Sequence, residues 1–347
     1  MRVNNKTVRM LVSIAIIVVV ALLVRNLAAP KGPQLQSGFG GGRLVMGTFA
    51  NITAVASDDE TIKASIEAAF DKLVEVDEMM SDYKADSELS VVNRDAFAGP
   101  VKVSDELFEV LKASVDYSRK TQGAFDITVG PVVELWRRAA KDGKKPGEEE
   151  LAEARAGVGY EKLILDEENK TVRFAVVGMK LDLGAIAKGY GVDRAIEEMK
   201  KAGAAGGLVD VGGDICCFGA SPKFDNIWRV GLEAPSGVSD YLLVLKLSDT
   251  AIATSGDYRR FVVVDGRRYS HIIDPATTAS AGELTSVTVI AARAMDADAL
   301  ATAVSVMGRA KGLGLIESIN NAEAIIIPAD KKLEFVKTSG ADAYIRK

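Results

Sequence analysis

The segment with the clearest chemical signature runs from residue 181 to residue 190, Leu-Asp-Leu-Gly-Ala-Ile-Ala-Lys-Gly-Tyr. It is typical of a short strand that reaches Gly184 and then turns into a helix. The N-terminus of a helix presents backbone N–H groups and the positive end of the helix dipole, both of which suit a phosphate. Lys188 adds a charge one turn into that helix. The segment predicts phosphate binding, although a plain strand-to-helix junction with a surface lysine has the same pattern.

Asp298 and Thr302 are the second pair that could do chemistry. They are four residues apart, so they share one face of a helix. A carboxylate and a hydroxyl stacked in this way, with a nearby carbonyl, can hold a hard cation. The alternative is an acid favoured by the dipole in a first helical turn, with a threonine that the helix tolerates.

Two polar turns and an isolated tyrosine carry the remaining candidates. The first turn, residues 253–258, contains Thr254 and Asp257, and the second, residues 269–275, places His271 before an Asp-Pro pair. An Asp-Pro pair usually marks only a turn, and a lone histidine is more often structural than catalytic. Tyr83 lies in a polar stretch, where it could stack on a ring or simply be a surface residue.

Rare residue types exclude several kinds of chemistry. The 347 residues include one histidine and two cysteines, so a zinc site of His and Cys ligands cannot be built. A Gly-x-Ser-x-Gly elbow is absent, which argues against a Ser-His-Asp hydrolase. Oxygen ligands, and therefore magnesium or calcium, are the expectation for any bound metal. The 48 acids outnumber the 43 bases, and six bases fall in residues 1–43, so the acidic body argues against nucleic acid as a partner.

The N-terminal segment predicts attachment to a membrane. Residues 10–24 are apolar except for Ser13 and are flanked by Arg9 and Arg25. A cleaved signal peptide would share this pattern, but an uncleaved anchor in residues 1–29 fits better, because no good cleavage site follows. Bases before the apolar run favour a cytoplasmic N-terminus and an extracytoplasmic body at the bacterial cytoplasmic membrane. Residues 30–42 are rich in Pro and Gly and are expected to be a flexible linker to a domain at 43–347.

Hydrophobic periodicity predicts the elements that must position these residues. Residues 44–56 suggest a strand, and residues 58–80 a helix with apolar side chains at helical spacing. Residues 180–183 suggest a short strand before a helix that ends near residue 201. Residues 298–307 suggest another helix, ended by a glycine. Helices and strands do not alternate strictly, so the fold class is expected to be α+β with mixed sheets and packed helices.

The order of these segments along the chain and their residue sequences resemble the ApbE family, the FAD:protein FMN transferases. The matching pieces are residues 46–48, 87–93, 123–131, 182–190, 209–215, 253–258, 271–275 and 298–302. The resemblance implies an α+β fold that binds FAD in a cleft. It also implies transfer of FMN through a phosphoester to a Thr or Ser of a flavoprotein subunit, with release of AMP. Acceptors of this kind include subunits of membrane redox complexes and similar FMN-binding domains.

The resemblance also implies roles for individual residues. Asp298, Thr302 and the carbonyl of Ala185 match the ligands of Mg²⁺, and His271 matches an active-site histidine. The positions that match flavin contacts are Met46, Tyr83, Asp182, Lys188, Asp193 and Thr254. Lys188 and Mg²⁺ could neutralise the charge that develops when a phosphoanhydride breaks, and His271 or Asp257 could accept the proton of the attacking hydroxyl.

Two alternatives stay open at this point. If water attacks in place of a protein hydroxyl, the same site is an FAD pyrophosphatase that yields FMN and AMP. If nothing turns over, the protein only binds FAD. The family usually follows Asp-Pro with Arg-Thr-Gly, whereas this chain has Ala276-Thr277-Thr278, a change that favours the binding-only alternative.

Overall fold

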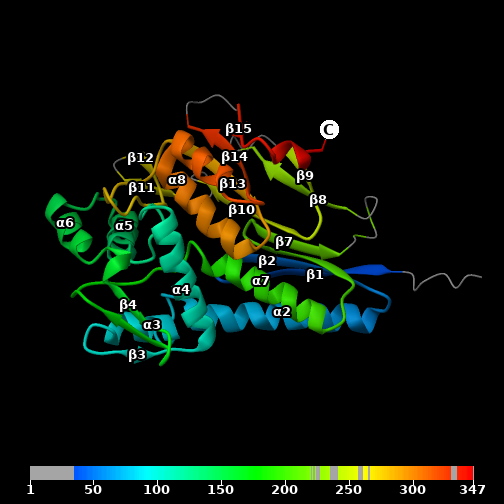
Figure 1. The fold of residues 1–347 in the computed structure, drawn as a ribbon, viewed down its shortest axis with the longest axis horizontal. Helices are drawn as coiled ribbons and strands as arrows, with labels where there is room; N and C mark the ends of the chain where they lie inside the picture. The colour runs from blue at the N-terminus through cyan, green and yellow to red at the C-terminus, as the bar shows by residue number, and fades with distance from the viewer. Residues whose placement is uncertain are drawn as a thin grey trace, which may run out of the picture. The chain divides into compact units, whose positions relative to one another are not determined.

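An antiparallel sheet organises the fold (Figure 1). The computed structural model describes residues 35–219, 221, 223, 227–234, 241–256, 261–264, 266–329 and 334–346. Within these residues the sheet has the strand order β1-β2-β6-β7-β10-β13-β14-β15. Its strands are β1 (Gln36–Val45), β2 (Thr48–Ala56), β6 (Gly206–Val211), β7 (Asp214–Gly219), β10 (Thr250–Gly256), β13 (Leu284–Ala291), β14 (Glu323–Pro328) and β15 (Val336–Lys337).

Smaller sheets accompany this one, and the expected α+β class is confirmed. β3 (Val101–Lys102), β5 (Thr171–Phe174) and β4 (Leu163–Asp166) form one sheet. The other two are the hairpins β8 (Trp228–Glu233) with β9 (Tyr241–Leu247) and β11 (Phe261–Val264) with β12 (Arg267–Ser270). All pairings between these named strands are antiparallel, so the described sheets are not mixed as the sequence suggested.

Three helices pack on one face of the large sheet (Figure 1). They are α2 (Asp59–Met80), α7 (Ala187–Lys201) and α8 (Ala294–Glu317). Asp58 caps α2 by accepting a hydrogen bond from the N–H of Thr61 at 2.8 Å. The apolar stripe of α2 at 62, 66, 70, 73 and 76 is buried, as its spacing predicted. These helices bury the sheet residues that point toward them.

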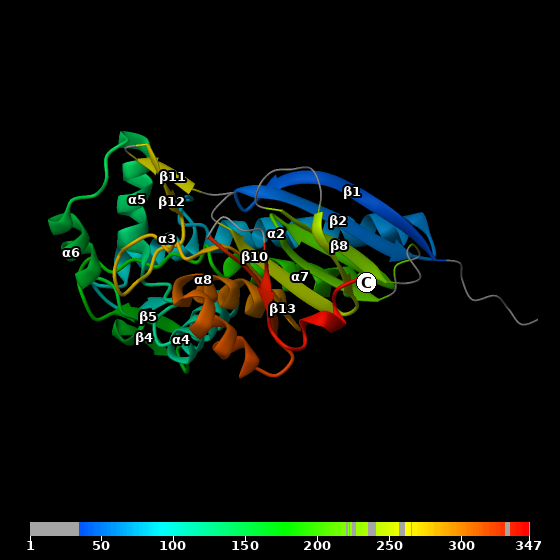
Figure 2. The same ribbon diagram turned by 90° about the horizontal axis from the view of Figure 1, so that it is seen from above.

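The opposite face of the sheet is covered by the β8–β9 hairpin. Because successive strand residues point to opposite faces, neighbours in one strand enter different cores. Cys216 faces the helices, while Cys217 packs with Trp228 and Leu245 of the hairpin. Both cysteines are free and buried. Figure 2 shows the sheet from above.

A group of shorter elements completes the description. It contains α3 (Glu88–Asp95), α4 (Asp105–Lys120), α5 (Gly130–Asp142) and α6 (Glu148–Ala156), with the short 3₁₀ helices η1 (Tyr160–Lys162) and η2 (Ala341–Ala343). α4 begins after Ser104, whose hydroxyl accepts the N–H of Leu107 at 3.2 Å. The expected end of a helix at Gly308 is confirmed: φ is 77° there, the backbone is not helical, and α8 consists of two helical halves that meet at this kink. The carboxylate of Glu283 accepts the N–H of Arg309 at 2.9 Å and so caps the second half.

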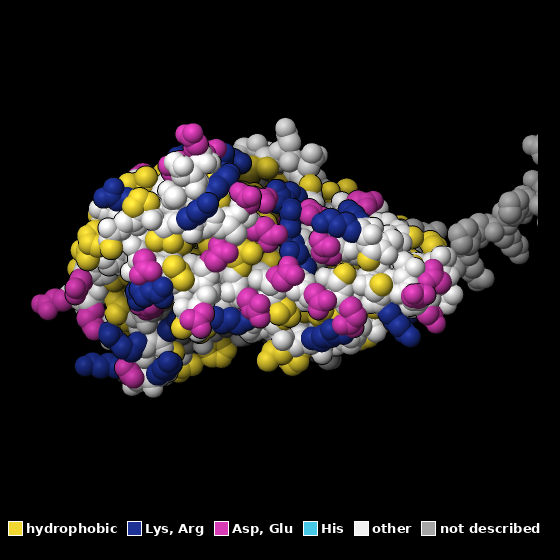
Figure 3. Space-filling model, turned by 90° about the horizontal axis from the view of Figure 1, so that it is seen from below, with side chains coloured by type: hydrophobic (Ala, Val, Ile, Leu, Met, Phe, Trp, Pro, Cys, Tyr) yellow, Lys and Arg dark blue, Asp and Glu magenta, His cyan; other side chains and the backbone are white. Residues whose placement is uncertain are grey.

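The N-terminal assignments are tested only in part. The proposed anchor, residues 1–29, lies outside the described residues. Residues 36–42, expected to be linker, instead form most of β1, since this glycine-rich strand pairs with β2 and packs closely on α2. In the described chain, α8 alone is long and apolar enough to cross a membrane, and half of that stretch is buried in the protein. Acidic and basic side chains are interspersed over the face drawn in Figure 3.

Candidate active site

A cavity of about 980 Å³ is lined by residues of the large sheet, of α5 and the turn before it, and of the N-terminal parts of α7 and α8. This volume is at the upper end of the range for small-molecule sites. It brings together most of the residues singled out in the sequence. The predicted residues that line it are Tyr83, Asp182, Ala185, Lys188, Thr254, His271, Asp298 and Thr302.

Lys188 lies between two buried carboxylates at the polar part of the cavity. Its Nζ forms an ion pair with Asp214 and lies 3.4 Å from both carboxylate oxygens of Asp298. Asp214 and Asp298 are 2% and 3% exposed. Burial and the adjacent Asp298 raise the pKa of Asp214 well above its usual range, and Lys188 offsets only part of that rise. One ammonium thus faces two carboxylates, an arrangement that favours an additional cation.

Asp298 also fixes the start of α7. No side chain from the residue before α7 caps the helix, and Asp298 accepts the N–H of Gly189 at 3.1 Å in that role. The two helices can approach this closely because residue 189 is glycine. A Cβ at this position would lie 2.3 Å from the carbonyl oxygen of Ala294 in α8. The Lys-Gly pair in the sequence therefore places the ammonium of one helix against the carboxylate of the other.

Other residues with oxygen ligands line the same cavity as this carboxylate. Thr302, one turn further along α8, has its hydroxyl 3.4 Å from the hydroxyl of Ser255 in β10. Thr254 hydrogen-bonds the hydroxyl of Thr288 at 2.9 Å, and Ala185 lines the cavity just before α7. No group of three or more His, Cys, Asp or Glu side chains suited to a metal occurs in the part of the chain that the structure describes. A carboxylate, a hydroxyl and a carbonyl are the ligand types that Mg²⁺ prefers, so these residues fit a hard cation.

His271 reaches the cavity from the residue after β12. The segment after it is a compact turn, in which Asp274 accepts hydrogen bonds from Ala276 and Thr277. Trp136 of α5 donates its indole N–H to the carbonyl of Thr278 at 3.1 Å and so ties the turn to the helix. Thr278 has φ +62°, an unusual value for a β-branched residue.

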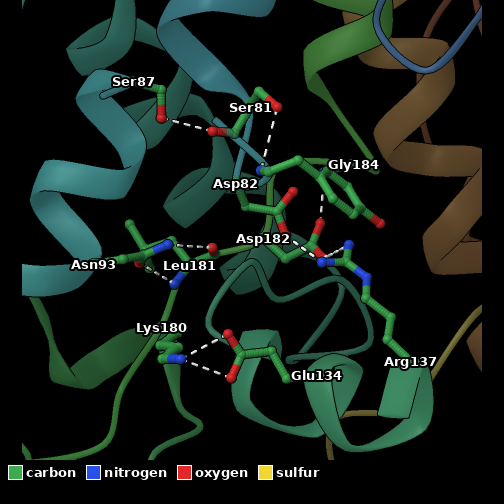
Figure 4. A network of polar contacts seen from close by, with 11 residues as sticks. Ser81, Asp82, Ser87, Asn93, Glu134, Arg137, Lys180, Leu181, Asp182 and Gly184 are labelled. Carbon is green, nitrogen blue, oxygen red and sulfur yellow. Dashed lines mark hydrogen bonds and ion pairs between the residues drawn. The ribbon is translucent and has the colours of Figure 1, made fainter. Parts of the chain in front are cut away.

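Tyr83 and Asp182 both line the cavity, and both contact Arg137. Figure 4 shows Arg137 and Asp182. The Tyr83 ring is 78% exposed, and the guanidinium of Arg137 lies 4.6 Å from its centroid. Arg137 also contacts the carboxylates of Asp82 and Asp182. Burial raises the pKa of Asp182, and the charge of Arg137 opposes that rise.

The segment before α7 is not a strand, contrary to the prediction for residues 180–183. Its only bridge is an isolated one from Lys180 to Val129, among the described residues. The backbone of Leu181 is instead held by Asn93, which accepts its N–H at 2.7 Å and donates to its carbonyl at 3.0 Å (Figure 4). A side-chain amide therefore supplies the bonds that a neighbouring strand would have made.

Three predicted site residues are placed differently or not at all. Met46 is not among the residues that line the cavity, since its side chain packs against Gly191 of α7 and the core. Asp193 was expected to contact flavin, but it is buried outside the cavity lining and accepts the N–H groups of Ala294 and Met295 at 2.8 and 3.0 Å. It therefore caps α8. Asp257 lies outside the described residues.

Asp126, Arg137 and Asp214 are site residues that the sequence did not single out for a role. Asp126 organises the turn before α5 by accepting the N–H groups of Thr128 and Tyr160 at 2.8 and 2.9 Å. Asp214 follows two glycines in the turn between β6 and β7. The helix that carries Arg137 could have been predicted, because α5 has a proline in its first turn and a glycine in the left-handed conformation after its last residue.

Curated relatives of the chain share one name. A protein of Haemophilus influenzae is 34% identical over 90% of this chain and 92% of its own length, and it is named FAD:protein FMN transferase. A protein of Vibrio cholerae with the same name is 35% identical over 87% of this chain and 91% of its own length.

Solved structures agree with this likeness. The ApbE protein of Thermotoga maritima has a TM-score of 0.81 at 32% identity, covering 90% of this chain and all of its own. The flavin transferase ApbE of Vibrio cholerae has a TM-score of 0.78 at 32% identity, covering 89% of this chain and 99% of its own. The model of the ApbE family matches residues 46–326, a range that includes all the cavity-lining candidates named above, from Tyr83 to Thr302. The chain belongs to the ApbE family.

Proposed function

We propose that this protein is an FAD:protein FMN transferase, which cleaves FAD and attaches the FMN half to a Thr or Ser hydroxyl of an acceptor flavoprotein while releasing AMP. The observation that carries the proposal is the placement of Lys188 and Asp298 beside the N-terminus of α7 in a cavity of about 980 Å³. A helix N-terminus and a lysine suit a diphosphate, and the volume suits a dinucleotide. The names of the relatives support the same activity.

The chain's own residues can supply most of the catalysis. The acceptor oxygen attacks the phosphorus of the FMN half, and the bond from that phosphorus to the oxygen of AMP breaks. Phosphoryl transfer depends chiefly on positioning and on neutralising charge as it develops. Lys188 provides a fixed positive charge, and the first turn of α7 provides N–H donors. His271 lines the cavity and is a candidate to accept the proton of the attacking hydroxyl, with Asp257 as the other candidate.

A divalent cation completes this proposal. Asp298, Thr302 and the carbonyl of Ala185 would hold Mg²⁺. When bound, the ion would neutralise charge on the diphosphate. The fit rests on the excess of two buried carboxylates over one lysine and on the hydroxyls of Thr302 and Ser255 in the same cavity.

The proposed setting follows from the N-terminal segment. An apolar run of the observed length between basic residues favours an anchor in the bacterial cytoplasmic membrane, with the enzyme on its extracytoplasmic side. Acceptors would then be flavoprotein subunits of membrane redox complexes or similar FMN-binding domains that face the same side. Flavoprotein genes beside this one would name candidate acceptors.

In-gel flavin fluorescence tests the proposal. The purified protein is mixed with FAD, Mg²⁺ and a candidate acceptor subunit, and the products are separated on a denaturing gel and by chromatography. A fluorescent acceptor band together with free AMP is the expected result. Free FMN and AMP with no labelled band would replace the transferase with an FAD pyrophosphatase. Unchanged FAD across a panel of acceptors would leave binding alone and refute turnover.

A further inference from the structure

Arg137 connects three segments at one part of the cavity lining, here called the Arg137 end (Figure 4). It projects from α5, contacts Asp82 in the loop after α2, and donates from Nη2 to Asp182 at 2.7 Å in the segment before α7. Its guanidinium also lies over the ring of Tyr83. A single side chain thus fixes an acid and an aromatic ring that both line the cavity.

The charge of Arg137 interacts with the carboxylates of Asp182 and Asp82. Burial opposes the charged form of Arg137, but Asp182 and Asp82 outweigh it, and the pKa of Arg137 is raised overall. Asp182 is itself fixed from two sides, since its other oxygen accepts the N–H of Gly184 at 2.8 Å. Without Arg137, two acids would remain at this end of the cavity with their shared cation removed, and Asp182 would lose one of its two anchors.

The walls beside this cluster are apolar and partly aromatic. Phe125, Ile127, Val133 and Trp136 line the same cavity and come from the turn before α5 or from α5 itself. This end therefore suits a flat heterocycle with a polar edge, whereas the end near Lys188 suits phosphate.

The donors and acceptors favour one of the two rings of a dinucleotide. A guanidinium has five N–H donors, and the two carboxylates engage one Nη nitrogen each. Each of these nitrogens carries a second hydrogen, which suits a carbonyl. The imide edge of a flavin alternates two carbonyls with one N–H, so it can use both a guanidinium and the carboxylate of Asp182. Adenine has no carbonyl.

We propose that Arg137 sets recognition of the flavin ring, by offering N–H donors to the imide carbonyls and by holding Asp182 and Tyr83 against that end of the ring. The proposal rests on the proposed function, because it takes FAD as the substrate. Arg137 contacts Asp82, Asp182 and Tyr83, so we expect it to act on binding of the ring and not on the phosphoryl transfer.

The test compares Arg137→Met with Arg138→Met in the full chain. Arg138 is the next residue of α5, pairs with exposed Glu150 and is not among the residues that line the cavity, so it is a matched control. Calorimetry with Mg²⁺ measures binding of FMN and of ADP separately. Arg137→Met is expected to lower the affinity for FMN by about tenfold or more and to leave the affinity for ADP within about twofold of wild type. Arg138→Met is expected to change neither affinity.

Further measurements separate recognition from folding. In turnover assays, Arg137→Met is expected to raise KM for FAD with kcat nearly unchanged, and Arg137→Lys to recover part of the FMN affinity. Unfolding midpoints of all variants show whether the fold is intact. FMN affinity unchanged in Arg137→Met, or a loss confined to ADP, would overturn the proposal. Wild-type protein that binds neither FMN nor ADP would instead refute the proposed function.

Discussion

The ammonium of Lys188 lies 3.4 Å from both carboxylate oxygens of Asp298, although it pairs still more closely with Asp214. Lys188 therefore neutralises Asp298 only in part. A cation that binds Asp298 must share the carboxylate with the lysine, and Asp214 provides the lysine with a second partner. Lys188 competes with a cation for Asp298 but supplies positive charge for catalysis. We therefore expect metal affinity and turnover to respond in opposite directions when the lysine is removed.

Asp298→Asn should show how far turnover depends on this carboxylate. The amide can still accept the N–H of Gly189, so the cap on α7 is kept while the charge is lost. We expect FAD cleavage at ordinary Mg²⁺ to fall by about 100-fold or more. The measurement is AMP release over a Mg²⁺ titration, with Asp298→Ala as the more severe variant, which should abolish turnover. Full activity in either variant would remove the metal assignment.

Lys188→Met should have opposite effects on metal and on chemistry. Two buried carboxylates would remain with no lysine beside them, so Mg²⁺ affinity measured by calorimetry should rise, while FAD cleavage falls because a fixed positive charge is lost. Lys180→Met is the control, since Lys180 pairs with Glu134 at an exposed site. Weaker Mg²⁺ binding in Lys188→Met would show that the lysine supports the cation and does not compete with it.

Gly189→Ala should separate α7 from α8. The new Cβ would lie 2.3 Å from the carbonyl oxygen of Ala294, and backbone cannot move aside as a side chain can. We expect a loss of about 1–3 kcal/mol in the free energy of unfolding, measured with urea, together with weaker Mg²⁺ binding.

Gly191→Ala is the matched control for this change. Its Cβ would meet the sulfur of Met46 at 3.1 Å and Leu73 at 3.2 Å, both in side chains that can shift. The gain in helix propensity from Gly to Ala should offset much of the cost. Equal losses of unfolding free energy in the two variants would show that the close approach at residue 189 does not determine the stability of the α7–α8 contact.

Asn93→Ala should disturb the position of Asp182 without touching the cavity. Both backbone groups of Leu181 lose their partner, and we expect the free energy of unfolding to fall by about 2–3 kcal/mol. KM for FAD should rise as Asp182 loses its support. Asn169→Ala, which removes an exposed bond to Asp166, is expected to change the free energy of unfolding by less than about 0.5 kcal/mol. A stable variant with unchanged KM would contradict the role of Asn93.

The sequence predicted elements well where local signals suffice. α2 was predicted because its apolar spacing is a local signal, and the glycine after residue 183 marked the approach to α7. The pair Asp298 and Thr302 was predicted because a helix fixes the spacing of residues four apart. Both residues do line the cavity.

What the sequence could not predict depends on partners distant in the chain. Nothing local to Leu181 shows that Asn93, 88 residues earlier, replaces a strand. Asp193 has the residue type of a ligand contact, and only the packing of α7 on α8 shows that it caps a helix. The sequence analysis assigned no element to residues 88–95 or 130–142. Arg137 lies in the second of these helices and was therefore not recognised as a site residue.

Asp193 should make stability depend on pH. Burial raises its pKa to about 6, although the N–H groups of Met295 and Ala294 and the charge of Arg293 act in the other direction and Asp296 adds to the rise. A carboxyl whose pKa is higher in the folded protein binds its proton more tightly there than in the unfolded chain. Its contribution to stability is therefore complete below about pH 4 and is lost as the pH rises through about 6.

Asp193→Asn tests this dependence. The amide removes the titration, so the difference in free energy of unfolding between variant and wild type should change by roughly 2–3 kcal/mol between pH 4 and pH 7, in favour of the variant at the higher pH. Urea unfolding at several pH values measures it. Asp296→Asn is the control, because it removes a neighbouring charge and keeps the carboxyl of Asp193. A constant difference between Asp193→Asn and wild type across this range would show that Asp193 does not titrate there, and that the N–H groups of α8 keep it ionised.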